Sequence, residues 1–329
     1  MNDTEKVSQE SLHKDAIRGF LPFLRRFGLL TALFIMIVTL SLTAEHFLTV
    51  SNIMNILLQS SNIGIMAAGM TVVIIASEID LAVASLQTLC AVVVAMLLVN
   101  AGVPIVLAIV ATLLLGIAAG AFSGFFVGWF GIPAFILTLA VDSLARGSAL
   151  IITDQNSIYG LPEPFAVLGQ GYIGPVPVAA VIMACTFLGI HLLLTRTVLG
   201  TNIYAVGGNK EAARVAGINV FAVKVIALMI SGGCGALAGI MMASRLMAAQ
   251  PIMGLYDLMD VIAAVVIGGT SLLGGEGRIV GTVIGTFIIV SMRNGLNLLG
   301  ISPDWQLIAV GTIIVLAVLV DYVGRKRVA

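Results

Sequence analysis

The chain has 329 residues, of which 60% are hydrophobic and only 10% are charged, with a formal net charge of zero. Soluble domains carry about 25% charged residues, and a surface this poor in charge would expose large apolar patches to water. The composition therefore excludes an ordinary soluble enzyme, a disordered chain and a nucleic-acid-binding protein. It predicts an all-α, polytopic membrane helix bundle in contact with membrane lipid.

Ten apolar segments are long enough to cross a membrane, which takes roughly 20 mostly apolar residues. The first exceeds the usual length of a signal-peptide core and lacks a small-residue cleavage site, so we expect a retained anchor. The predicted domains are a cytoplasmic N-terminal segment (1–26), a transmembrane domain (27–322) and a cytoplasmic tail (323–329). The ten segments lie near 27–44, 53–76, 80–99, 104–130, 132–152, 175–194, 222–243, 258–274, 279–300 and 305–322.

Two acids, Glu78 and Asp80, separate the second and third segments. We expect two helices joined by a tight turn in which Asp80 caps the following helix, with a broken or re-entrant helix as the alternative. Asn55, Gln59 and Asn62 recur at helical spacing on one face of the preceding helix. These amides and acids are candidates for lining a path for a polar, uncharged solute, and hydrogen bonding between helices is the alternative for the amides.

Glycines recur every four residues along the fourth segment, at Gly116, Gly120, Gly124 and Gly128. Small residues at this spacing let helix backbones approach closely in lipid. We interpret the repeat as a packing surface, and a surface that slides during a conformational change is the functional alternative.

The loop 195–221 is the longest predicted on the cytoplasmic side, and it contains a short helix predicted over 210–216. Lys210 and Arg214 lie four residues apart there, which gives the helix a charged side. A helix this short is marginal alone, so we expect it to dock on a partner. The predicted chain breaks and caps around it are Gly207, Gly208, Asn209 and Gly217.

A second glycine cluster ends the eighth segment, at Gly268, Gly269, Gly274 and Gly275. The cluster lacks the lysine and the strand of a phosphate-binding loop, so a flexible hinge between two helices is the prediction.

Lysine and arginine concentrate near both termini and in the 195–221 loop, whereas the loop 153–174 has neither residue. This bias places both termini and the 195–221 loop in the cytoplasm. Ten crossings divide into five and five, and a five-helix repeat reverses its orientation in the membrane. The sequence therefore allows two inverted repeats, an architecture that recurs in transporters.

No catalytic or metal-binding pattern is visible. The three cysteines and three histidines lack metal-ligand spacing, and no nucleotide-binding loop occurs. We expect no metal, no cofactor and no catalysis in this chain, with energy supplied by a separate subunit.

Six strings occur in a fixed order along the chain. Together they resemble the membrane permease subunits of ribose-type, binding-protein-dependent ABC importers. Ala82 and Ala84 stand where that family usually has serine and glycine, which weakens any substrate role for position 82. The strings are SEIDLAVAS, ARGSALIITD, AVGGNKEAARVAGI, ASRLMAAQP, DVIAAVVIGGTSLLGGEGRIVGTVIG and NGLNLLGISPDWQ.

The resemblance implies a multi-pass protein of the bacterial inner membrane that assembles with several partners. These are an ATP-binding cassette ATPase that holds ATP and Mg²⁺, a periplasmic or extracellular sugar-binding protein, and a second permease chain, identical or different. The short cytoplasmic helix looks like the coupling helix that seats in the ATPase. Its matching residues are Gly207, Gly208, Asn209, Lys210, Glu211, Ala212, Arg214 and Gly217.

These observations predict a permease that moves a monosaccharide or a related neutral solute by alternating access. The alternative is an ion- or proton-coupled secondary transporter that uses Glu78 or Asp80 as its proton site.

Overall fold

The structure, a computed structural model, describes residues 29–326, and the predicted N-terminal segment 1–26 lies outside them. Each of the ten predicted segments contains one helix, so the all-α prediction is confirmed.

The last helix continues to Lys326, into the range predicted as a tail. The helices are Leu29–Thr43, α2 (Val50–Ile75), α3 (Val83–Val99), α4 (Ile105–Phe130), α5 (Ala134–Ile152), α6 (Val167–Gln170), α7 (Val178–Arg196), α8 (Val198–Gly208), α9 (Lys210–Val215), α10 (Val220–Leu246), α11 (Asp257–Ile267), α12 (Ile279–Leu298) and α13 (Pro303–Lys326), with a short 3-10 helix, η1 (Glu163–Ala166).

Six of the helices described here, α2, α4, α5, α7, α10 and α12, are long and apolar enough to cross a membrane. The others are shorter or less apolar, so the count of ten crossings and the inverted five-helix repeats stay predictions.

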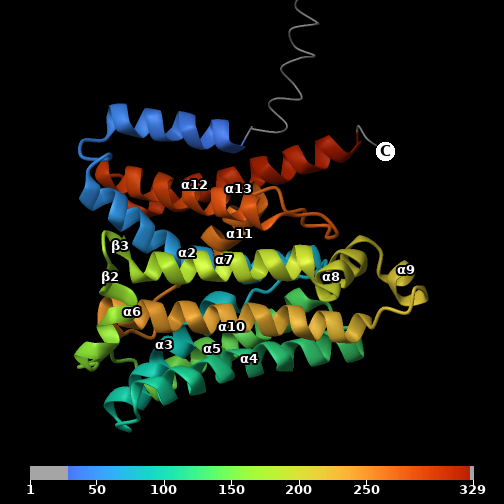
Figure 1. Ribbon diagram of the computed structural model, residues 1–329, viewed down its shortest axis with the longest axis horizontal. Helices are drawn as coiled ribbons and strands as arrows, with labels where there is room; N and C mark the ends of the chain where they lie inside the picture. The colour runs from blue at the N-terminus through green and yellow to red at the C-terminus, as the bar shows by residue number, and fades with distance from the viewer. Residues whose placement is uncertain (1–28, 327–329) are drawn as a thin grey trace, which may run out of the picture.

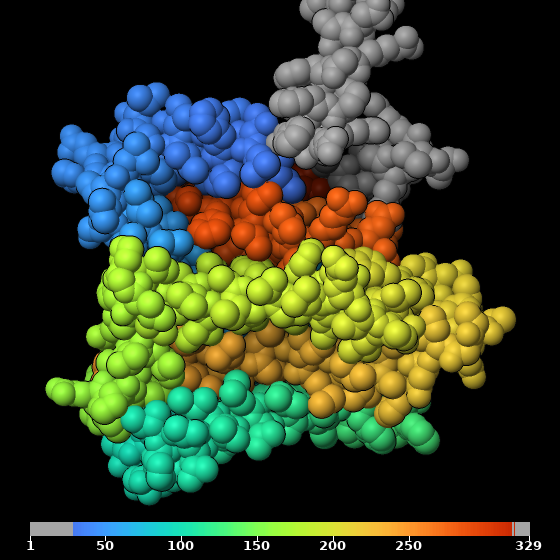
Figure 2. All heavy atoms as spheres, viewed as in Figure 1, coloured from blue at the N-terminus to red at the C-terminus, as the bar shows by residue number. Residues whose placement is uncertain are grey.

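The long helices lie side by side along the longest dimension of the molecule (Figure 1). The helix Leu29–Thr43 lies at one edge beside α12 and α13, α7 and α10 cross the middle, and α4 and α5 lie at the other edge. The short helices α8 and α9 project from one end, which we call the α9 end (Figure 2).

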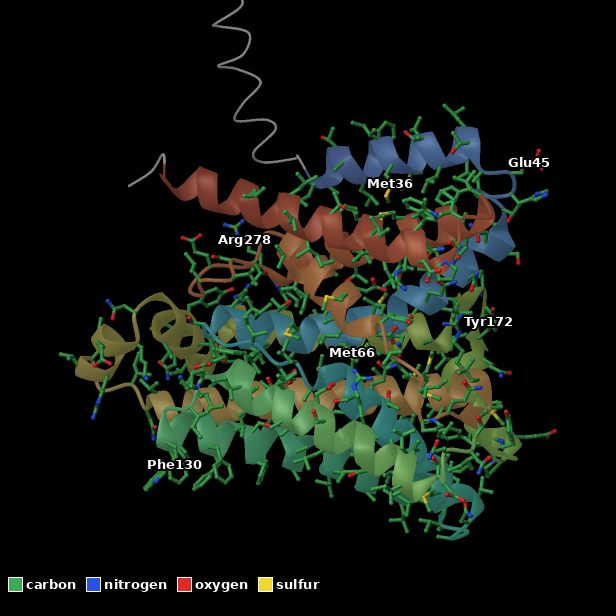
Figure 3. The ribbon with its side chains drawn as sticks, turned by 180° about the vertical axis from the view of Figure 1, so that it is seen from behind. Met36, Glu45, Met66, Phe130, Tyr172 and Arg278 are labelled. Carbon is green, nitrogen blue, oxygen red and sulfur yellow. The ribbon has the colours of Figure 1, made fainter. Side chains whose placement is uncertain are left out.

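Two short antiparallel strand pairs lie at the opposite end, which we call the strand end. There β1 (Ile158–Tyr159) pairs with β4 (Ala248–Ala249), and β2 (Tyr172–Ile173) pairs with β3 (Val176–Pro177). In Figure 3, Arg278 and Phe130 lie toward the α9 end, Tyr172 lies at the strand end, and Met66 lies in the middle of the bundle.

The four regularly spaced glycines lie where α4 meets α10. A Cβ atom added to Gly120 would lie 2.7 Å from the carbonyl carbon of Leu228, and one added to Gly124 would lie 2.5 Å from the Cα of Val225. Real Cβ contacts essentially never fall below 3.0 Å, so the two helix backbones touch directly. Such contact is the arrangement by which small residues hold helices together in lipid.

The link between α2 and α3 differs from the predicted tight turn. Residues 76–82 form a non-helical segment that returns into the bundle, where Asp80 is only 3% exposed. The N-cap position of α3 is Ala82, not Asp80. Because Val83 and Gln87 lie against Gly235 and Gly239 in the second half of α10, α3 begins near the middle of the bundle and runs to the strand end.

A second broken segment precedes α11. Residues 247–256 turn back from the strand end, and α11 then runs from the bundle interior toward the α9 end. The prediction of a crossing over 258–274 is wrong in extent, because α11 has only 11 residues and spans about 16 Å of a core about 30 Å thick. The helix ends at Ile267 with Gly268 as its C-cap, and Gly269 follows with a φ of 83°.

Candidate functional site

A polar cavity of about 220 Å³ lies inside the bundle, where α2, α10, α11 and α12 meet. Its volume is below the range typical of drug-sized ligands, so it suits a small solute. Charged and amide side chains are rare at such depth, because each costs free energy to remove from water. The lining residues are Gln59, Asn62, Ile63, Met242, Arg245, Asp257, Asp260, Val290 and Arg293.

Asp257, the first residue of α11, connects three helices. Its Oδ2 accepts hydrogen bonds from Asn62 Nδ2 of α2 and from Gln87 Nε2 of α3, each at 3.2 Å. The chain reaches this point through a turn at Gly254, whose φ of 71° favours glycine. The beginning of α11 is therefore fixed against α2 and α3 by a single carboxylate.

Asp260 lies one turn further along α11 and pairs with Arg293 of α12. Their closest atoms, Arg293 Nη2 and Asp260 Oδ1, are 2.8 Å apart, and the Asp260 side chain is only 3% exposed. Arg245, in the last turn of α10, contributes a second guanidinium to the lining. Two carboxylates and two guanidinium groups thus share the cavity, and their formal charges balance.

Several buried polar atoms at this site lack a hydrogen-bond partner among the described residues. Besides Asp260 Oδ1 and Arg293 Nη2, which form the ion pair, they include the acceptors Asn62 Oδ1 and Gln87 Oε1 and the donor Nε of Arg293. Unsatisfied buried polar atoms are uncommon in native proteins and call for an explanation. A hydroxylated molecule answers both needs, because each hydroxyl group donates one hydrogen bond and accepts others.

The predicted path residues separate into two groups. Gln59 and Asn62 border the cavity, whereas Asn55 is half-buried on the same helix and does not line it. Glu78 forms an ion pair with Lys224 in the first turns of α10. Asp80 accepts hydrogen bonds from the Ser231 hydroxyl at 2.7 Å and from the Ala82 amide at 2.9 Å, away from the cavity.

The sequence patterns did not predict the charged lining of the cavity. Arg245 and Arg293 lie near predicted segment ends, where arginines ordinarily mark topology. Asp257 and Asp260 are three residues apart on one helix face at the start of an apolar run, and that spacing of ionisable residues is the signal that could have found them.

The predicted short cytoplasmic helix is present as α9. Asn209 caps it by accepting a hydrogen bond from the Ala212 amide at 2.9 Å, and Gly217 follows it with a φ of 83°. Ala213 is buried, whereas Glu211, Arg214 and most other residues of the helix are exposed. The helix therefore presents a charged surface at the end of the molecule.

The end of α8 contacts the chain at two distant places. Gly207 lies against the carbonyl of Ile75, the last residue of α2, and a Cβ on Gly207 would lie 2.7 Å from the amide nitrogen of Gly275. Gly275 in turn donates a hydrogen bond to the Ile75 carbonyl at 2.9 Å. We call this contact of Ile75, Gly207 and Gly275 the glycine junction. It joins α8, and through it α9, to α2 and to the loop 268–278 that follows α11.

A bundle of apolar helices around a polar cavity is the architecture of a membrane transport protein, and sequence comparison shows the family. The chain belongs to the family of permeases described as branched-chain amino acid transport system / permease component, which matches residues 52–318.

Several curated relatives cover nearly all of the chain. The Ribose import permease protein RbsC of Escherichia coli (strain K12) is 44% identical over 89% of this chain and 92% of its own length. RbsC of Bacillus subtilis (strain 168) is 41% identical over 98% of both chains. The D-allose transport system permease protein AlsC of Escherichia coli (strain K12) is 37% identical over 99% of this chain and 100% of its own. No solved structure matches the chain.

Proposed function

We propose that this chain is the membrane permease of an ABC importer and translocates a neutral monosaccharide across the bacterial inner membrane. The observation that carries the proposal is identity of 37–44% over nearly the whole chain with permeases named for ribose import and D-allose transport. The chain is a transport component and not an enzyme, so ATP hydrolysis belongs to a separate ATPase subunit that holds ATP and Mg²⁺.

The exposed helix α9 is the proposed docking site for that ATPase. Its residues from Lys210 to Arg214, together with the flanking Gly207, Gly208 and Gly217, form the surface that transmits the ATPase movement. Two features support this role: Glu211 and Arg214 are exposed, and the glycine junction connects α8 to helices on either side of the cavity.

The proposed orientation places the α9 end in the cytoplasm. Lys210, Arg214 and Arg278 lie toward this end, as positive charge does on the cytoplasmic side. An aromatic cluster lies there as well: Phe125 stacks on Trp129 with ring centroids 6.1 Å apart, and Phe221 packs edge-on against both. Such belts occupy membrane–water interfaces. The last helix, α13, ends toward this same end (Figure 1), which agrees with a cytoplasmic C-terminus.

The remaining partners are a sugar-binding protein on the opposite face and a second permease chain, the same or different. Within the bundle, Gln59 and Asn62 are the proposed path residues, supported by their place at the cavity. The relatives do not favour the ion-coupled alternative. Glu78 is already paired with Lys224, and Asp80 is held by Ser231.

Uptake measurements test the proposal directly. The chain is expressed together with an ATP-binding cassette ATPase and a sugar-binding protein from the same organism. Uptake of labelled ribose, allose and xylose is then measured with and without a functional ATPase. We expect uptake of at least one sugar that requires all three proteins. Uptake that persists with an inactive ATPase and follows an ion gradient would refute the proposal.

A further inference from the structure

The geometry points to the cavity between α2, α10, α11 and α12 as a binding subsite for a neutral polyhydroxylated solute within a single permease chain. This inference rests on the proposed function and adds to it the residues that hold the solute. The cavity is the one place among the described residues where two acids, two arginines and two amides meet.

The first step of the argument is the charge of the site. Asp257 and Asp260 face Arg245 and Arg293 across one cavity, so the formal charge is zero. A charged solute would bring into this low-dielectric interior a charge that the balanced site cannot neutralise, which is costly. The balance therefore selects uncharged solutes.

The second step is hydrogen-bonding capacity. Asn62 is 7% exposed, and its Oδ1 has no partner among the described residues. The hydrogen bonds from Asn62 and Gln87 both end on Oδ2 of Asp257, so Oδ1 keeps acceptor capacity. Arg293 supplies a free donor, its Nε. The site thus offers acceptors on α2 and α11 and a donor on α12. Adjacent hydroxyl groups of one solute can bond to all of them, because each hydroxyl donates one hydrogen bond and accepts others.

The third step is the shape of the lining. Ile63, Met242 and Val290 provide an apolar wall beside the polar groups. A sugar ring has the same division, with C–H groups on one side and hydroxyls at its edge. Binding sites for small molecules commonly combine apolar walls with a few placed polar groups.

A labelling experiment on the permease–ATPase complex in membrane vesicles tests this subsite. A thiol is introduced into the cavity lining by the double substitution Met242→Cys and Cys185→Ser, because Cys185 is the exposed native cysteine and Cys90 and Cys234 are buried. The rate at which N-ethylmaleimide modifies the introduced thiol is measured with ribose, allose or xylose, and with the corresponding sugar acids.

We expect a neutral sugar to slow the modification of the introduced thiol, and the sugar acid at equal concentration to have no effect. In Asp257→Asn, half-maximal protection should require about tenfold more sugar, because the hydrogen bond from the sugar then ends on a neutral acceptor and not on a charged one. Asp142→Asn is the matched control. It breaks the ion pair with Arg146 on α5, away from the cavity, and should keep full protection. If Asp257→Asn does not assemble, Gln59→Leu, a substitution on α2, is expected to weaken protection in the same way.

Three results would overturn the subsite. No sugar protects the introduced thiol, sugar acids protect it as well as neutral sugars do, or sugar protects the thiol in the cavity variants as well as it does in the Asp142→Asn control. Uptake by the complete transporter separates this failure from failure of the proposed function. Normal uptake without protection rejects only the subsite, whereas absence of uptake of every monosaccharide rejects the function itself.

Discussion

Replacing Gly207 with alanine should uncouple solute movement from ATP hydrolysis. The new Cβ would overlap the Ile75 carbonyl oxygen and lie 2.7 Å from the Gly275 nitrogen, where ordinary contact begins at 3.4 Å. Gly275 must therefore move by about 0.7 Å, and Ile75 by more. Overpacking of this kind costs about 1–3 kcal/mol, and loss of the hydrogen bond from Gly275 to Ile75 adds about 1 kcal/mol.

The assay compares thermal unfolding, ATP hydrolysis and sugar uptake of the assembled transporter. We expect a loss of about 2–4 kcal/mol in the stability of the glycine junction. If about 1.4 kcal/mol of this loss raises the activation free energy of the step that moves the solute, uptake drops about tenfold while ATP hydrolysis continues.

The control for Gly207→Ala is Gly189→Ala in α7. Gly189 lies inside a helix, and a Cβ there would meet nothing within 4 Å. Alanine is favoured over glycine in helices, so this variant should be as stable as the parent or more stable, with unchanged uptake. If Gly207→Ala matches the control in both stability and uptake, the glycine junction does not transmit the coupling movement.

Three further outcomes are expected. Gly120→Ala should force α4 away from α10 and destabilise the protein by about 1–3 kcal/mol relative to Gly189→Ala, which is measured as a lower melting temperature. An equal melting temperature in the two variants would contradict direct backbone contact. Glu211→Lys should reduce uptake and co-purification of the ATPase while abundance stays normal, because Glu211 is exposed; unchanged co-purification would remove α9 as the docking site. Glu78→Gln should destabilise the protein by about 3–5 kcal/mol, because it leaves the buried Lys224 unpaired. Addition of Lys224→Met should restore both stability and uptake. Persistent loss of uptake in the stable double variant would instead favour Glu78 as a proton site.

The helices were predictable because the signal for a membrane helix is local. An apolar run of sufficient length has few alternatives in lipid, where every backbone polar group needs a partner within the protein. The short helix α9 was predictable for a similar reason, since its cap Asn209 and its terminating Gly217 act on immediate neighbours. These signals require no knowledge of the rest of the fold.

The cavity could not be predicted in the same way, because its residues come together only through tertiary structure. Asp257 reaches Asn62 because residues 247–256 turn back into the bundle, and no hydropathy average distinguishes such a segment from a loop between two crossings. Arg293 looks like a topology marker until its partner on α11 is known. The amides on α2 were found because they share a local periodicity, which the charged residues, spread over three helices, do not.

The two broken segments give the cavity a connection to both ends of the molecule. From the interior, α3 runs to the strand end and α11 runs to the α9 end, and Asp257 at the beginning of α11 is hydrogen-bonded to Gln87 of α3. The loop that follows α11 contains Gly275, which is bonded to the end of α2 and packed against Gly207. Under the proposed coupling, a displacement of α9 therefore reaches the cavity by two routes, along α2 to Asn62 and along α11 to Asp257. Because these two residues share one hydrogen bond, a relative shift of α2 and α11 would change the geometry of the site that holds the solute. A permease that releases its solute when the ATPase moves requires such a change.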